Sequence, residues 1–465
     1  MPIEFFEEVY DVKALSLFGG RRKSGQPLPA YIYLLLISQL LFNIGFYIVV
    51  PFLAVVLADG FAQAGTMIGL VLGLRTFSQQ GLFFLGGGLT DKYGARPILL
   101  TGISLRVIGF ITTGMTSHYA TVNGKSDNLA NTWSLVGFIG GVVIIGFAAA
   151  LFSPAVETSL ADSGARLEAQ GTSTRAHIFA LDSAYSTVGS GLGPLIGALL
   201  LPLGFDICCY AAAAIFVFLG ITHLIMLPTS VHPARRGPIT QDWSHVLRDR
   251  RFLVLAAAYS MSLVAYNQMY LSLPVELTRG TGSDQSMGIM FLIAGVWVII
   301  LQVPLARIAA RYSPTRAVAV GFLIMASSFT IVAVCAPWSR SLAPAIAFVV
   351  VLNVGNMIVS PIARDLVGVH AKNIKLGTYY GVLNSVGGAA VLITSPLLGK
   401  LLNSAYHPTQ SAMIPWIVLA AGMVGAAITI YVWGRRTARL LQQPRHADAP
   451  DNSSQLTDQI EEFSS

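Results

Sequence analysis

Charge is what this chain has least of: only 11% of its 465 residues are Asp, Glu, Lys or Arg, whereas soluble domains carry about 25%. So few charges cannot cover a water-soluble surface of this size. High hydrophobicity with little charge also excludes a disordered chain. Cysteine is scarce too, and three residues without metal-ligand spacing exclude a disulfide scaffold and imply no metal site.

Catalytic motifs are missing as well. The sequence has no GxxxxGK[ST], HExxH, GxSxG or CxxC pattern. It therefore lacks the phosphate cradle of a primary ATPase, the ligands of a metalloprotease and the nucleophile turn of a hydrolase. We expect neither an enzyme nor a bound cofactor.

Long apolar runs dominate the chain instead. Apolar residues make up 54% of it, and the mean hydropathy is +0.66. Twelve runs are long enough to cross a hydrocarbon core of about 30 Å. We place them at 31–57, 66–89, 97–116, 132–153, 177–201, 207–228, 252–276, 287–306, 317–335, 342–363, 377–402 and 411–434. The sequence therefore predicts an all-α integral membrane protein.

The distribution of Lys and Arg predicts the orientation of the spans. Of the 29 basic residues, 23 fall in the tails and loops of one side and four in those of the other. Because basic loops stay in the cytoplasm, we expect both termini there, in a multi-pass protein of the cell membrane. The net charge of +7 then reflects topology, and no nucleic-acid partner is expected.

The two halves of the chain resemble each other. Ser153-Pro154 closes the fourth span where Ser360-Pro361 closes the tenth, and Leu181-Asp182-Ser183 opens the fifth where Leu383-Asn384-Ser385 opens the eleventh. Such repeats are typical of transporters that alternate access between two bundles. We expect a cytoplasmic tail at 1–30, six-helix bundles at 31–228 and 252–434, a cytoplasmic central loop at 229–251, and a disordered cytoplasmic tail at 435–465.

The most specific motif lies in the short hairpin between the second and third spans. Its residues Gly87, Asp91, Lys92, Gly94 and Arg96 combine a glycine that allows close helix approach, a glycine suited to a turn and three charges that a simple turn does not need. Residues 87–99 resemble the signature of the major facilitator superfamily, and residues 73–102 are similar to its MdtH-type multidrug transporters.

This resemblance implies a twelve-helix major facilitator fold over about 31–436 and roles for the motif. Asp91 would help to hold the cytoplasmic gate by docking near the start of the eleventh span. Arg96 would pair with an acid after the fourth span, with Asp162 as the first choice and Glu157 as the second.

A glycine stripe in the fifth span is the second motif. Gly189, Gly193, Pro194 and Gly197 lie on one helix face, which a generic packing stripe also explains. The pattern resembles the antiporter motif of drug-exporting facilitators, except that Ala198 stands where a second glycine is usual. The resemblance implies a contact between the halves and export by exchange.

Three charges lie well inside the apolar runs: Arg75, Arg106 and Asp182. Gln79, four residues after Arg75, extends a polar stripe on the second span. Each charge needs a partner or a watery cavity. Asp182 is the only deep carboxyl, so it is the candidate proton carrier, and a purely structural Asp182–Arg ion pair is the alternative. Arg106 is expected to be structural.

Two departures from drug:proton antiporters bear on this assignment. The first span offers no acid, and the fourth span, at 132–153, contains no Arg. Either Asp182 carries the proton or the coupling is different.

Polar and aromatic stripes predict a broad, weakly polar cavity, with helix-to-helix hydrogen bonding as the alternative for each residue singly. The stripes comprise Gln39, Asn43, Tyr47, Tyr259, Tyr266, Asn267, Tyr270, Asn353, Asn356 and Asn384. We expect a monomeric exporter of small amphipathic or cationic compounds, driven by the proton gradient and contacting only substrate, protons and lipids. A carrier for one metabolite is the alternative, and a membrane receptor is a third.

Overall fold

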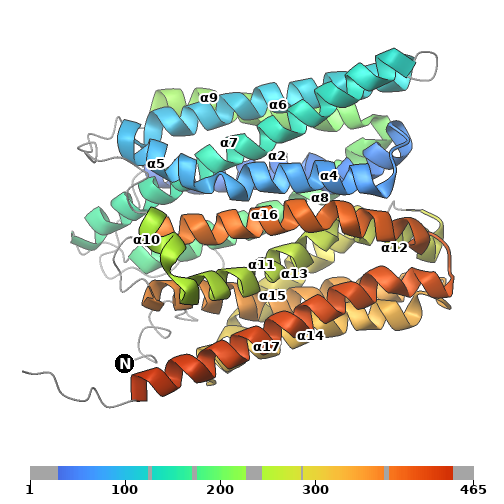
Figure 1. Cartoon of the computed structure of the whole chain (residues 1–465). Coiled ribbons are helices and arrows are strands. Elements are labelled where there is room, and N and C mark those ends of the chain that lie inside the picture. The colour runs from blue at the N-terminus through green and yellow to red at the C-terminus, as the bar shows by residue number, and fades with distance from the viewer. Residues whose placement is uncertain are drawn as a thin grey trace, which may run out of the picture.

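The computed structural model describes residues 30–123, 128–169, 175–226, 243–283, 286–309, 311–370 and 376–442. Within these ranges it contains twelve helical segments long and apolar enough to cross a membrane, matching the predicted spans. Figure 1 shows them as two groups of roughly parallel rods, blue to green in one and green to red in the other.

The first bundle comprises six spans. Their helices are α2 (Ala30–Val49) continued by α3 (Leu53–Val55), α4 (Gly65–Thr76) continued by α5 (Phe83–Tyr93), α6 (Ala95–Asn123), α7 (Asn128–Ala169), α8 (Arg175–Leu200) and α9 (Phe205–Met226). Helix α6 packs on α7 and α9, and α2 packs on α8 and α9. Gly94, with a φ of 87°, ends α5 and allows the tight turn into α6.

The second bundle repeats this arrangement. Its helices are α11 (Arg250–Leu271) continued by α12 (Leu273–Thr281), α13 (Met287–Ala309), α14 (Pro314–Cys335), α15 (Ala343–His370), α16 (Leu376–Leu402) and α17 (Ile414–Gln442). Helix α14 packs on α15 and α17, and α11 packs on α16. The short α10 (Trp243–Arg248) precedes α11. Asp249 caps α11 by accepting hydrogen bonds from the backbone N–H groups of Arg251 and Phe252.

The ends of the bundle differ. The α5–α6 turn, α10 and the end of α17 lie together at what we call the terminal end, and α12 lies at the far end (Figure 1). The distribution of Lys and Arg predicts that the terminal end faces the cytoplasm.

A seam of glycines joins the two bundles. Helix α16 runs along α4 and α5, and backbones meet because a Cβ at Gly69 would lie 2.1 Å from the Ser395 carbonyl oxygen and one at Gly73 3.1 Å from the Leu392 Cα. The same close contact extends to the far end, where Gly65 meets the Gly399 carbonyl oxygen. Small residues permit such approach where lipid supplies no hydrophobic driving force. Gly65, Gly69 and Gly73 of the second span thus form the main contact between the bundles.

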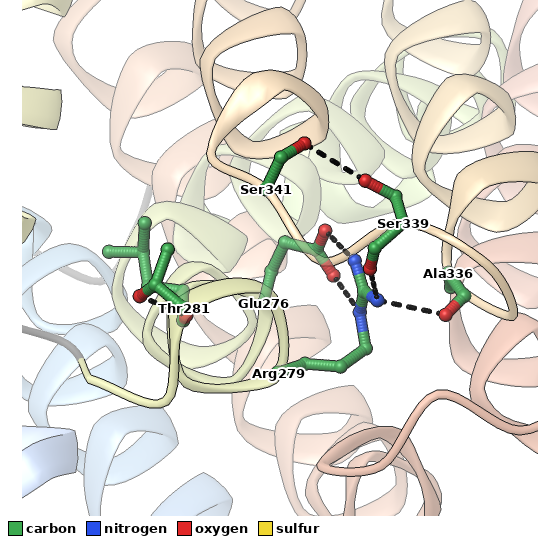
Figure 2. A network of polar contacts seen from close by, with 7 residues as sticks. Glu276, Arg279, Thr281, Ala336, Ser339 and Ser341 are labelled. Atoms are coloured by element: carbon green, nitrogen blue, oxygen red, sulfur yellow. Dashed lines mark hydrogen bonds and ion pairs between the residues drawn. The ribbon is translucent and has the colours of Figure 1, made fainter.

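The seventh span is longer than predicted and carries two more charges. Glu276 and Arg279 lie in α12, with both side chains fully buried and an Nη2–Oε1 distance of 2.5 Å. Arg279 Nη1 also donates to the carbonyl oxygens of Ala336 and Ser339, so the pair fastens α12 to the α14–α15 loop (Figure 2). The predicted seventh span ended at residue 276, which left Arg279 in the following loop. The structure instead buries Arg279 with Glu276, because opposite charges can be buried as a hydrogen-bonded pair.

Candidate functional site

Arg75 lies on the seam between the bundles, at mid-span in α4. Its side chain is 6% exposed, and its guanidinium carbon lies 5.3 Å from the ring centroids of Phe46 and Tyr270. Phe46 belongs to the first bundle and Tyr270 to the second. Arg75 therefore faces the second bundle rather than lipid.

A chain of hydrogen bonds crosses the seam beside this arginine. Arg75 Nη2 donates to Thr76 Oγ1 at 3.3 Å, and Thr76 Oγ1 donates to Asn267 Oδ1 at 3.3 Å. Asn267 Nδ2 then donates to Ser395 Oγ at 3.1 Å. Spans two, seven and eleven are thus linked by polar groups in a buried region, where an unmade hydrogen bond is costly.

Aromatic rings line the same part of the seam. Tyr270 lies 5.5 Å from Phe291 and 6.3 Å from Tyr266, and Tyr47 of the first bundle lies 6.4 Å from Phe291. The structure thus brings three of the predicted cavity tyrosines together around Arg75. Phe291 of α13 was not predicted, since one phenylalanine in an apolar run carries no distinguishing signal.

Arg106 lies in a box of aromatic rings inside the first bundle. Its guanidinium carbon is 3.9 Å from the Phe42 centroid, 4.8 Å from that of Phe46 and 5.1 Å from that of Phe216. The side chain is 0% exposed. Each cation–π contact contributes roughly 0.5–2 kcal/mol, against about 2.5–3.5 kcal/mol or more for a charge at the membrane centre. This enclosed position agrees with the expected structural role.

Neither arginine is paired with an acid in the part of the chain that the structure describes. Arg75 Nε and Nη1 and all three Arg106 nitrogens are buried without a hydrogen-bond partner. The Asp182 carboxyl instead contacts the Gln39 side chain, and its Oδ1 has no partner. Among these residues the structure does not contain the Asp182–Arg ion pair considered as the alternative.

Spans one and five carry further predicted residues side by side. Asn43 Nδ2 donates to Ser186 Oγ at 3.0 Å and to the Gln39 carbonyl oxygen at 2.8 Å. Gln39, Asn43 and Asp182 therefore form a polar strip between α2 and α8 toward the terminal end. Gln79 of the second span is half-buried, and its Oε1 has no partner.

Glu157 of α7 interacts electrostatically with Arg364 of α15 across the seam and with Asp182 beside it. Glu157 and Arg364 are exposed although both lie within spans, whereas nearly all of residues 264–280 are buried. Packing along the seam is thus tighter toward the far end. Glu157 was named only as a second partner for Arg96, and the role of Arg364 was not predicted.

The three glycines of the α8 motif pack on α2 of their own bundle, contrary to the prediction, whereas Pro194 of the same motif meets the second bundle. A Cβ at Gly193 would lie 2.6 Å from Tyr47 Cβ, and one at Gly189 or Gly197 would meet backbone oxygens of the same helix, α2. The contact with the second bundle uses the adjoining face. A Cβ at Gly288 of α13 would lie 2.6 Å from Ala198 Cβ and 2.9 Å from the Pro194 carbonyl oxygen. Packing of α2 against α8 explains the three glycines.

The hairpin motif is described in part. Arg96 Nη2 donates to the Leu224 carbonyl oxygen at 2.9 Å, which fastens α6 to the end of α9. Gly87 has space around it, and Lys92 is exposed beside the Tyr93 ring. The side chains of Asp91 and Asp162 lie outside the described residues, so their predicted contacts stay predictions.

The remaining polar residues are dispersed. Asn353 Nδ2 donates to the Val349 carbonyl oxygen of its own helix, and Tyr259 lies beside Arg364. Asn356 and Asn384 are half-buried. The residues predicted to line one cavity therefore fall into two separate clusters, one around Arg75 and one toward the terminal end.

A cavity of about 340 Å³ lies between the bundles at the far end. Asp59 and Ile68 line it from the first bundle, and Thr278, Asn403 and Tyr406 from the second. Asn403 Oδ1 accepts a hydrogen bond from the Gly65 N–H at 3.0 Å, so the seam is closed beside it.

Two packed six-helix bundles with a polar centre on their seam define a membrane transporter of the facilitator type. The model of the Major Facilitator Superfamily matches residues 35–395, and the chain belongs to this family.

Relatives with known sequences include an MFS-type transporter of Mycobacterium tuberculosis, 32% identical over 84% of this chain and 91% of its own. The multidrug resistance protein MdtH of Escherichia coli is 28% identical over 88% of this chain and 96% of its own.

Solved structures share the fold. A POT family transporter in complex with 5-aminolevulinic acid has a TM-score of 0.70 at 12% identity, covering 88% of this chain and 96% of its own. The nucleoside transporter NupG has a TM-score of 0.69 at 14% identity, covering 86% of this chain and 99% of its own.

Proposed function

We propose that this transporter exports small amphipathic compounds across the cell membrane in exchange for protons, by alternating access between its two bundles. The observation that carries the proposal is the Asp182 carboxyl, half-buried within a span, in contact with an amide and without an arginine partner among the residues that the structure describes. A carboxyl free of an ion pair can take up and release a proton as its surroundings change.

The hydrogen bonds across the seam supply the moving part. When the bundles separate at one end, the Thr76–Asn267 bond between them is broken or lengthened, and substrate or water takes its place. Protonation of Asp182 removes its charge and favours the conformation in which Gln39 and Asp182 are more deeply enclosed. The 28% identity with MdtH supports multidrug efflux. The proposal further takes the protein to be a monomer with both termini in the cytoplasm, as the distribution of Lys and Arg predicts for the termini.

Dye accumulation in a host lacking its own pumps tests this function. Expression should lower the steady-state level of amphipathic fluorescent dyes several-fold, and a protonophore should restore the level. Asp182→Asn should no longer lower the dye level at equal expression. Asp206→Asn is the control and should still lower it, because the Asp206 carboxyl pairs with His118 at the far end. A carrier for one metabolite would leave all dye levels unchanged.

A further inference from the structure

The middle of the first bundle holds two positive charges that no carboxylate of the described residues neutralises. Five of the six guanidinium nitrogens of Arg75 and Arg106 are buried without an acceptor. A guanidinium donates five hydrogen bonds and accepts none, so its vacant N–H groups can be satisfied only by an acceptor. The two charges also act on each other, which makes the region more positive than either alone.

Only one of these arginines lies on the seam between the bundles. Arg106 is enclosed by three phenylalanine rings of its own bundle. Arg75 instead contacts Tyr270 of the second bundle and begins the hydrogen-bond chain that crosses the seam. The Phe46 ring contacts both guanidinium groups, so Arg106 adds its charge from behind that ring.

The deep acid is too far away to neutralise them. Asp182 contacts Gln39, which precedes Phe46 by seven residues on α2. At ~1.5 Å per residue this places the carboxyl roughly 10 Å nearer the terminal end. A ligand beside Arg75 therefore meets a positive potential, which attracts an anionic group and repels a cationic one.

We infer that Arg75 binds a carboxylate carried by the amphipathic substrate, while the rings of Tyr47, Tyr266, Tyr270 and Phe291 hold its apolar body. The planar guanidinium presents paired N–H donors that match the two carboxylate oxygens. The inference rests on the proposed function for the statement that the bound compound is exported, and it narrows the substrate class to amphipathic acids and zwitterions.

Binding to the purified full-length protein in nanodiscs tests the inference, with rhodamine B and its ethyl ester as probes. The two dyes differ only in the free benzoate. Fluorescence anisotropy should show that the acid binds at least tenfold more tightly than the ester. Arg75→Gln should raise the Kd of the acid at least tenfold and that of the ester less than twofold. Arg75→Lys, which keeps the charge without the planar fork, should retain part of the preference.

Several outcomes would overturn the inference. Equal affinity of the wild type for the two dyes would do so, as would an equal loss of both in Arg75→Gln with full binding in Arg75→Lys. If Arg75→Gln does not fold, competition decides: benzoate should displace rhodamine B from the wild type, and benzyl alcohol should not. Failure of benzoate to compete contradicts the inference.

A second arm separates the substrate carboxylate from a small inorganic anion. The Kd of rhodamine B should be unchanged when sodium methanesulfonate replaces sodium chloride. Chloride competition that disappears in Arg75→Gln would assign the site to the inorganic ion and overturn the substrate assignment. Because no gradient is used, a protein that binds the acid but fails to lower dye levels in cells would reject export and leave the carboxylate site standing.

Discussion

Glu157 and Arg364 occupy equivalent positions in the two repeats and carry opposite charges. Each lies three residues after the proline of its Ser-Pro pair, and the two interact electrostatically across the seam between α7 and α15. Their side chains are exposed in this conformation and do not form a direct ion pair. In the proposed alternating-access cycle, these two positions of opposite charge would attract each other as the bundles close at the terminal end.

Export lost by reversing one charge of this pair should return when both charges are exchanged. Glu157→Arg and Arg364→Glu should each place like charges at the closing seam and lower dye export about fivefold or more, the effect of a coupling near 1 kcal/mol. The double variant should recover most of the export. Efflux rates at matched expression measure this, and a double variant no better than the worse single variant would show that the two residues act separately.

The α4–α16 seam should not tolerate a side chain at Gly69. A methyl group there would lie 2.1 Å from the Ser395 carbonyl oxygen, so Gly69→Ala must push the bundles apart. We expect a lower melting temperature and slower export.

Gly140→Ala is the control, because a Cβ at Gly140 meets nothing within 4 Å. Equal behaviour of the two variants would mean that the close contact at Gly69 does not matter.

The buried pair in α12 should depend on both its members. Arg279→Gln leaves Glu276 buried without its charged partner, which costs about 3–5 kcal/mol when one half of such a pair is removed. The melting temperature of the purified protein should fall strongly.

Arg340→Gln, at an exposed position of the α14–α15 loop, should leave it unchanged. A double variant, Glu276→Gln with Arg279→Gln, should be more stable than Arg279→Gln alone. If it is not, the charge left on Glu276 is not the cause of the loss.

Much of the fold could be predicted from the sequence because a membrane restricts the solutions. Apolar runs marked the twelve spans, and the Ser-Pro repeats marked two bundles. The same repeats could also have revealed the Glu157–Arg364 relationship. Aligning the two Ser-Pro pairs places an acid and a base at the third residue after each proline. Spacing within one helix cannot show which neighbour a face meets, and for that reason the α8 glycines were assigned to the wrong contact.

Buried charges were harder to predict than spans. An apolar run ends where charged residues begin, so the predicted span stopped before Arg279. The partner Glu276, three residues earlier, nevertheless allows Arg279 to be buried. The two arginines could be recognised as charges inside apolar runs, yet their aromatic surroundings depend on Phe42, Phe46 and Phe216 from other spans. Such clusters arise only from tertiary packing.

Proton exchange is most directly tested in proteoliposomes with an imposed pH gradient. With the wild-type protein, a gradient that drives protons one way should drive rhodamine B the other way, and collapse of the gradient should stop the movement. Asp182→Asn should move the dye down its own gradient only, independent of pH. Gradient-driven uptake by Asp182→Asn equal to that of the wild type would contradict the role of Asp182, and no response of the wild type to the pH gradient would contradict proton antiport itself.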